Sequence, residues 1–145
     1  MLSILSYPHR KTGFSLLELL IVLLILGVLT AIAYPSYRDH LIHARRIEGQ
    51  TALLDLANRM EGYYSEHHTY KTATLAGLER LTSINEIYHL QIVIVTDTAY
   101  VLQAMPNGAQ LSDVRCQSLT LTSEGKRGIA RGPTQIPTGT VKQCW

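Results

Sequence analysis

A run of twenty residues with a single charge dominates this sequence. The segment Phe14–Ala33 is apolar or small almost throughout, and its one charged side chain is Glu18. Twenty residues of α-helix rise about 30 Å, which matches the hydrocarbon thickness of a bilayer. Arg10 and Lys11 directly precede the run, so the positive-inside rule places the N-terminus in the cytoplasm and exports the remainder. The run therefore predicts a helix that crosses a membrane once.

A secretory signal peptide is the alternative interpretation of the same run, with Ala31-Ile32-Ala33 as a small-residue cleavage site. The apolar stretch is longer than the usual core of such a signal, and a carboxylate stands near its start. The periodic pattern also continues beyond Ala33. These features favour the membrane helix.

Glu18 is unusual inside such a helix. A carboxylate at mid-membrane costs about 2.5–3.5 kcal/mol, and less near an interface. No Lys or Arg lies within a helical turn of Glu18. We therefore expect its partner to be interfacial water or a group on another chain, one candidate being an amine created by cleavage just upstream.

These residues carry a family resemblance. The sequence Lys11-Thr12-Gly13-Phe14-Ser15-Leu16-Leu17-Glu18, followed by the apolar run, resembles the prepilin motif of type IV pilins. The resemblance implies that prepilin peptidase cleaves between Gly13 and Phe14 and that Phe14 is N-methylated. It further implies that Glu18 pairs with the N-terminal amine of a neighbouring subunit.

Gly27 and Pro35 also fall where pilins let this helix bend or locally unwind. Proline removes a backbone donor and weakens the preceding turn, which agrees with that role in assembly.

An amphipathic helix is predicted to continue to about Tyr64. Leu53, Ala57, Met60 and Tyr64 recur at helical spacing, with Leu56 and Tyr63 beside them, and predict a face that packs on a sheet. Charged residues are expected to fill the other faces: Arg45, Arg46, Glu48, Asp55, Arg59 and Glu61.

The following residues predict a small antiparallel sheet. After a long loop over Ser65–Ile87, strands are expected at Tyr88–Thr96 and Ala99–Met105, a turn at Pro106–Gly108, and a strand at Cys116–Thr122. A second turn at Gly125 and Gly128 precedes a short fourth strand, and Gly132–Trp145 is expected to be irregular.

The predicted fold class is therefore α+β and pilin-like: a long N-terminal helix, half transmembrane and half amphipathic, packed on about four antiparallel strands. The expected organisation is a leader over residues 1–13, a transmembrane assembly helix over 14–35 and a periplasmic head domain over 36–145.

Two cysteines, Cys116 and Cys144, lie in the part predicted to be exported, where disulfides persist. Two buried free thiols are the alternative to a bridge, which the compartment disfavours. A bridge would close a loop of 29 residues and contribute roughly 3.5 kcal/mol on the chain-entropy model. The resemblance implies the same bridge, since many type IV pilins staple a C-terminal segment to the sheet. This region resembles small minor pilins of the PilE and ComP kind.

The charge distribution suggests a binding surface only locally, near the C-terminus. The net charge of +2 comes from the first thirteen residues, and the remainder has eleven basic and eleven acidic side chains. From Val114 to Trp145, however, five basic residues stand against Glu124 alone. Lys126, Arg127 and Arg131 are possible DNA contacts, and a solvated surface is the alternative.

Nothing in the sequence predicts an enzyme, a cofactor or a metal site. His40 and His43 stand at i, i+3, while His67 and His68 lie about 24 residues further on, too far along a helix to share a zinc ion. No nucleophile, zinc-protease, phosphate-loop or EF-hand motif is present.

We therefore predict a minor pilin of a type IV pilus that resides in the inner membrane and in the extracellular fibre. Its expected partners are other pilin subunits, in a homo- or hetero-oligomeric fibre, and prepilin peptidase. The fibre would support pilus biogenesis, twitching motility, adhesion or DNA uptake. The alternatives are a DNA-binding pilus subunit for natural transformation and a type II secretion pseudopilin. The predicted C-terminal disulfide loop and the lack of an acidic calcium cluster disfavour the pseudopilin.

Overall fold

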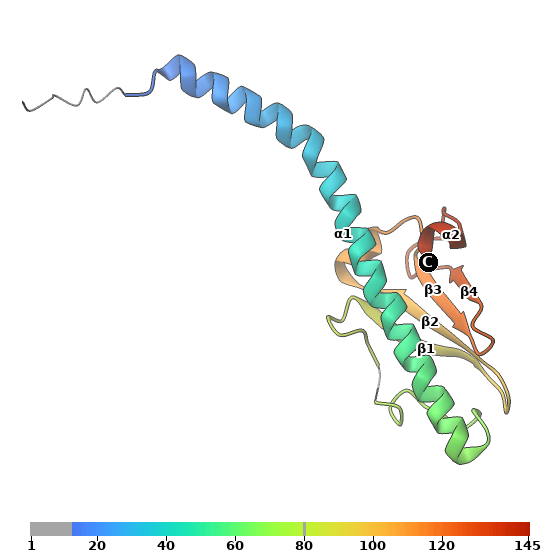
Figure 1. The fold of residues 1–145 in the computed structure, drawn as a ribbon. Coiled ribbons are helices and arrows are strands. Elements are labelled where there is room, and N and C mark those ends of the chain that lie inside the picture. The colour runs from blue at the N-terminus through green and yellow to red at the C-terminus, as the bar shows by residue number, and fades with distance from the viewer. Residues whose placement is uncertain (1–12, 80) are drawn as a thin grey trace, which may run out of the picture. The chain divides into compact units, whose positions relative to one another are not determined.

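The computed structural model describes residues 13–79 and 81–145. The predicted leader, except Gly13, lies outside these residues. The chain divides between Arg38 and Asp39 into two compact units. The elements, in chain order (Figure 1), are α1 (Leu16–His67), β1 (Tyr88–Val95), β2 (Tyr100–Pro106), the 3-10 helix η1 (Gly108–Ser112), β3 (Ser118–Thr122), β4 (Arg127–Ala130) and α2 (Val141–Cys144).

The first unit consists of the start of α1, and its apolar side chains are exposed. Phe14 is 81% exposed and Leu24 is 68% exposed, and an 18-residue window of this helix has a mean hydropathy of 2.8. Within the part of the chain that the structure describes, α1 is the one helix long and apolar enough to cross a membrane. The backbone stays helical through Gly27 and Pro35 and shows no local unwinding there.

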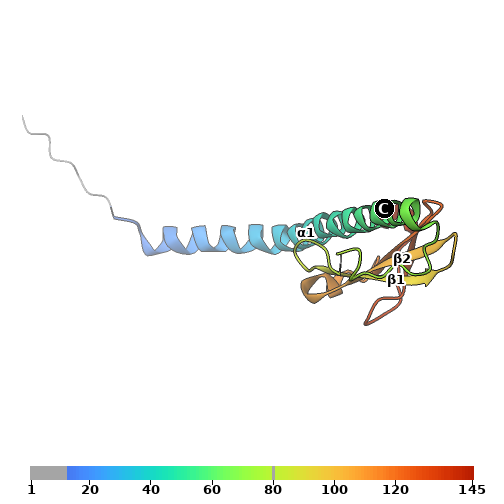
Figure 2. The same ribbon diagram turned by 90° about the horizontal axis from the view of Figure 1, so that it is seen from below.

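The second unit contains a four-stranded antiparallel sheet in the order β1-β2-β3-β4. Each strand pairs with the next along the chain, so hairpins and short connections suffice. The register of β1 against β2 shifts between Ile92 and Ile94. The part of α1 in this unit covers one face of the sheet (Figure 2). The predicted α+β class is confirmed.

The core forms where the amphipathic part of α1 meets that face. Leu53, Leu56 and Met60 are fully buried against sheet residues such as Leu102 and Leu119. The predicted stripe is confirmed, with its remaining members packed at the edge of this core: Ala57, Tyr63 and Tyr64.

Several predicted boundaries are wrong by a few residues. α1 runs three residues past Tyr64, to His67. Pro106 ends β2 rather than opening a turn, and the 3-10 helix η1 follows it. Gly128 lies inside β4, opposite Thr120, whereas Gly125, with a φ of +75°, makes the turn.

The third strand and the C-terminus also differ from the prediction. β3 begins at Ser118 because Gln117 adopts a left-handed φ of +48°, which interrupts the extended backbone after Cys116. The segment expected to be irregular contains α2. At its start, the backbone N–H of Thr140 donates to the side-chain oxygen of Gln143 at 3.0 Å, as in one half of a capping box.

Candidate functional site

The residues of the prepilin motif lie at the exposed start of the first unit. Gly13 and Phe14 precede α1, and Glu18 lies in its first turn. A carboxylate there is favoured by the positive end of the helix dipole. No cation within residues 13–79 and 81–145 pairs with Glu18. Its side chain is therefore available to a group from outside the described residues.

The C-terminal segment is attached to the second unit at several points. Cys116 and Cys144 are joined by a disulfide with Cα atoms 5.5 Å apart. Gln50 of α1 donates to the Cys144 carbonyl at 2.8 Å, and the indole of Trp145 donates to the Gly128 carbonyl at 2.8 Å. Together these contacts hold α2 between helix α1 and strand β4.

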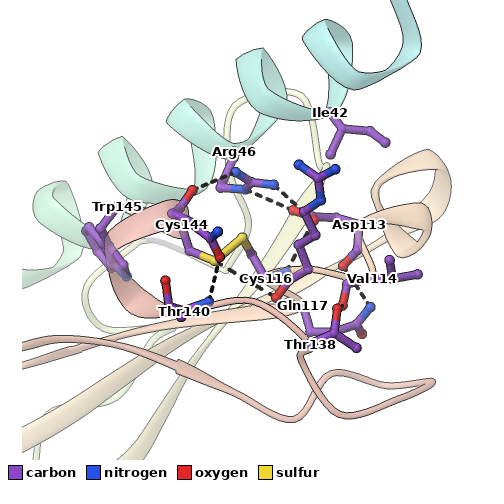
Figure 3. The surroundings of a disulfide bond; sticks show 12 residues. Ile42, Arg46, Asp113, Val114, Cys116, Gln117, Thr138, Thr140, Cys144 and Trp145 are labelled. Atoms are coloured by element: carbon purple, nitrogen blue, oxygen red, sulfur yellow. Dashed lines mark hydrogen bonds and ion pairs between the residues drawn. A yellow bond between two sulfur atoms is a disulfide. The ribbon is translucent and has the colours of Figure 1, made fainter. Parts of the chain in front are cut away.

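A buried ion pair lies beside the disulfide, and the sequence did not predict it. Arg46, expected on a solvated face, points from α1 to Asp113 (Figure 3) and donates to both carboxylate oxygens, at 2.9 and 3.0 Å. The two side chains are only 8% and 1% exposed. Arg46 also donates to the Gln143 carbonyl at 3.2 Å, so the pair connects α1 to α2. The expectation that Arg46 lies on a solvated face is wrong. Its burial could not be predicted because its partner, Asp113, is 67 positions away in the sequence.

The same buried network reaches the end of the sheet. The Gln110 amide donates to the Tyr88 hydroxyl at 3.0 Å and to Asp113 at 3.3 Å. Burial, followed by the charge of Asp113, raises the pKa of Tyr88. The backbone N–H of Cys116 donates to Asp113 at 3.2 Å, which ties the carboxylate to the disulfide. These contacts rigidify the connection between η1 and β3.

The three basic residues predicted as DNA contacts do not share one loop. Lys126 lies in the β3–β4 turn, where its ammonium is 2.6 Å from the Glu124 carboxylate. Arg127 begins β4, and Arg131 follows its end. The Arg127 guanidinium lies 5.4 Å from the centre of the Trp145 ring, within the range of a cation–π contact. All three basic side chains belong to exposed residues, and only Lys126 has an acidic partner among the residues described.

The histidines lie apart. His40 and His43 are exposed near the start of the second unit, and His67 stacks on Tyr63 at the end of α1 with ring centres 4.0 Å apart. Across residues 13–79 and 81–145, no group of three or more metal-binding side chains is placed to hold an ion.

Three features together define the type IV pilin class. They are a long helix with an exposed apolar start, an antiparallel sheet on which the later part of that helix packs, and a C-terminal segment held by a disulfide. The family model described as "Type IV minor pilin ComP, DNA uptake sequence receptor" matches residues 35–120. The model of the prokaryotic N-terminal methylation motif matches residues 8–34. The chain belongs to the ComP family of type IV minor pilins.

Individual relatives agree with this family. The chain is 27% identical over 122 residues to the type IV major pilin protein PilE of Neisseria gonorrhoeae, covering 83% of this chain and 72% of that protein. It is 27% identical over 121 residues to PilE1 of the same organism and spans 56% of its length. The solved structure of the non-core minor pilin PilV of Neisseria meningitidis has a TM-score of 0.54 and 27% identity, covering 69% of this chain and 97% of PilV.

Proposed function

We propose that this minor pilin binds DNA at the surface of the fibre and serves in DNA uptake. The observation that carries the proposal is the match of residues 35–120 to a family described as a receptor for the DNA uptake sequence. A pilus subunit is suited to this task because copies along a fibre give avidity to weak individual contacts.

The β4 edge supports DNA contact. Arg127 begins β4 and Arg131 directly follows its end, so the two residues are four positions apart in the sequence. Both are exposed, so both guanidinium groups are accessible to a phosphate backbone. Trp145, beside Arg127, adds an aromatic ring at this edge. Lys126 contributes less because Glu124 competes for its ammonium.

The test is a titration of the purified full chain, held in detergent, against labelled duplex DNA at several salt concentrations. Each neutralised phosphate changes the slope of log affinity against log salt by about 0.9. We expect a slope of about 2–3 for the wild type, and a decrease of about 2 in the variant Arg127→Gln with Arg131→Gln.

A matched control removes the same charge elsewhere, with Arg45→Gln and Lys71→Gln. It should retain the wild-type slope. DNA binding that is absent in the wild type, or equal slopes for both double variants, would reject this DNA contact surface. A duplex selected from a random pool, compared with its scrambled version, then measures sequence preference.

We also propose the maturation and topology that the N-terminal motif implies. Prepilin peptidase would cleave between Gly13 and Phe14 and Phe14 would be N-methylated. The helix would cross the inner membrane once, with the second unit in the periplasm. The match to the methylation motif over residues 8–34 supports the proposed cleavage and N-methylation. Intact mass spectrometry of the protein from its native membrane measures cleavage, methylation and the disulfide together. A wild-type mass that still includes residues 1–13 would refute the maturation step.

A further inference from the structure

An open pocket of about 470 Å³ lies at the start of the second unit, away from the β4 edge residues that we assign to DNA. Asp39, His40, His43 and Arg46 of α1 line one side, and Val114 and Arg115, between η1 and β3, line the other. This volume is within the usual range for sites that hold small molecules. The lining combines cationic and acidic groups with an apolar contact.

The pocket offers donors suited to a phosphate. Arg46 has five N–H donors, and the structure shows acceptors for three of its N–H groups among the residues described. The remaining donors belong to a guanidinium fixed by Asp113, so little entropy is lost when an oxyanion binds. His43 lies one turn before Arg46 on the helix, and Arg115 extends the donor set from the opposite wall.

The charges of the lining balance, which favours a zwitterion over a free anion. Arg46 is neutralised by Asp113, and Arg115 lies 4.0 Å from Asp39. That separation exceeds a direct hydrogen bond, and the two side chains are 67% and 72% exposed, so each can still take a ligand group. A phosphate beside the arginines and an ammonium beside Asp39 would satisfy both.

The position along the chain indicates a lipid as the source of these groups. Tyr34 and Tyr37 are 63% and 61% exposed, and tyrosines at the end of a membrane helix occupy the headgroup level. His40 follows Tyr37 by only three residues in the sequence. This step rests on the proposed single membrane span.

We propose that the pocket binds the headgroup of a phospholipid that carries a phosphodiester and a primary ammonium. The phosphate contacts Arg46, His43 and Arg115, and the ammonium contacts Asp39. Val114 lies beside the glycerol. Such a site would hold the second unit against the membrane surface until the subunit leaves for the fibre.

The test is native mass spectrometry of the full chain in detergent, with the fraction carrying one lipid measured for two short-chain probes. Dioctanoyl phosphatidylethanolamine has a primary ammonium, whereas dioctanoyl phosphatidylcholine has a quaternary one without N–H donors. We expect the wild type to bind phosphatidylethanolamine at least fivefold more tightly than phosphatidylcholine. Asp39→Asn should abolish this preference, and His43→Ala with Arg115→Gln should weaken phosphatidylethanolamine binding about tenfold.

His89→Ala with Lys71→Gln is the matched control, since both residues are exposed and neither lines the pocket. It should bind lipid like the wild type. Equal lipid binding by the pocket variant and the control would overturn the proposal. The proposal would also be overturned if inorganic phosphate displaced the bound lipid as effectively as unlabelled lipid does, because the site would then be one for free phosphate. Carbonate extraction of native membranes tests the membrane span separately, since lipid binding is measured in detergent.

Discussion

At Gly49, helix α1 lies close to Tyr88 of strand β1. A Cβ atom at this position would lie 2.9 Å from two ring carbons of Tyr88, a distance that real Cβ contacts essentially never show. The Tyr88 ring is fully buried, and its hydroxyl is held by Gln110, so it has little freedom to move aside. Packing therefore requires a glycine at this position. Backbone conformation does not, since Gly49 lies in regular helix.

The substitution Gly49→Ala should destabilise the protein. Over-packing costs about 1–3 kcal/mol, and the better helix propensity of alanine returns about 1 kcal/mol, leaving a net loss of up to about 2 kcal/mol. Urea unfolding of the full chain in detergent measures it. Gly62→Ala is the control, because nothing lies within 4 Å of a Cβ there, and it should stabilise by up to about 1 kcal/mol. A Gly49 variant as stable as the Gly62 variant would contradict the packing argument.

Together with burial, Glu61 raises the pKa values of two tyrosines, Tyr70 and Tyr100. It accepts hydrogen bonds from Tyr70 at 2.9 Å and Tyr100 at 2.8 Å. Burial, followed by the hydrogen bond to Glu61, raises the pKa of Tyr70 from 10.0 to about 12, and the same causes raise that of Tyr100. A raised tyrosine pKa gives stability that is fully present below pH 10 and is lost as pH rises towards about 12, because only the folded state then keeps the proton.

Glu61→Gln should therefore shift part of the tyrosinate absorbance titration to lower pH and flatten the loss of stability over this alkaline range. The exposed Glu66→Gln, on the same helix, is the control and should titrate like the wild type. If both variants titrate alike, Glu61 does not set these pKa values.

At the scale of elements, the C-terminal segment depends on covalent and polar attachment more than on its own helix. α2 has four residues, too few to be stable alone. The disulfide, the Arg46 and Gln50 contacts to its carbonyls and the indole of Trp145 hold it in place. Arg46 therefore links the amphipathic part of α1 to both η1 and α2.

Removing the bridge with Cys144→Ser should lower stability by roughly 3.5 kcal/mol on the chain-entropy model for this loop. The loss should appear as faster tryptic cleavage after Arg127 and Arg131, while the α1 part of the core, around Leu53, remains protected. Reduced wild-type protein should behave like the variant. Equal cleavage rates for oxidised and reduced protein would show that the polar contacts alone hold the segment.

The sequence predicted elements whose pattern is local. Leu53, Leu56 and Met60 repeat with the helical period, and the strands carry β-branched runs bounded by turn residues, so their burial could be inferred. Arg46 could not be placed, because a charged residue beside Arg45 looks solvated until Asp113 is brought to it by the fold. The left-handed conformation of Gln117 could not be inferred either, since nothing in its residue type favours it.

At the scale of the whole molecule, the two units face different environments. In the second unit, apolar residues of α1 and of the sheet, such as Leu53, Leu102 and Leu119, form a shared core. In the first unit, the large apolar side chains from Phe14 to Ile32 are exposed, an area that a water-soluble monomer does not leave uncovered. Lipid covers such a helix in the membrane, and helices of other pilins would cover it in a fibre. Glu18 is the one acidic group in the described part of this surface that precedes Pro35.

Glu18→Ala should separate these two environments. Membrane insertion should be retained, because removing a carboxylate relieves a cost of up to about 2.5–3.5 kcal/mol. Incorporation into fibres should fall about tenfold or more, since the proposed bond to a neighbouring amine is charge-assisted and worth about 1.5–3 kcal/mol. Carbonate extraction measures the first quantity, and immunoblots of sheared pili measure the second. Thr30→Ala is the control, because the Thr30 hydroxyl bonds to carbonyls of its own helix, at 2.8 Å to Leu26 and 3.0 Å to Gly27. Glu18→Ala protein that enters sheared pili as well as the Thr30 variant would exclude the pairing and leave Glu18 as an interfacial group.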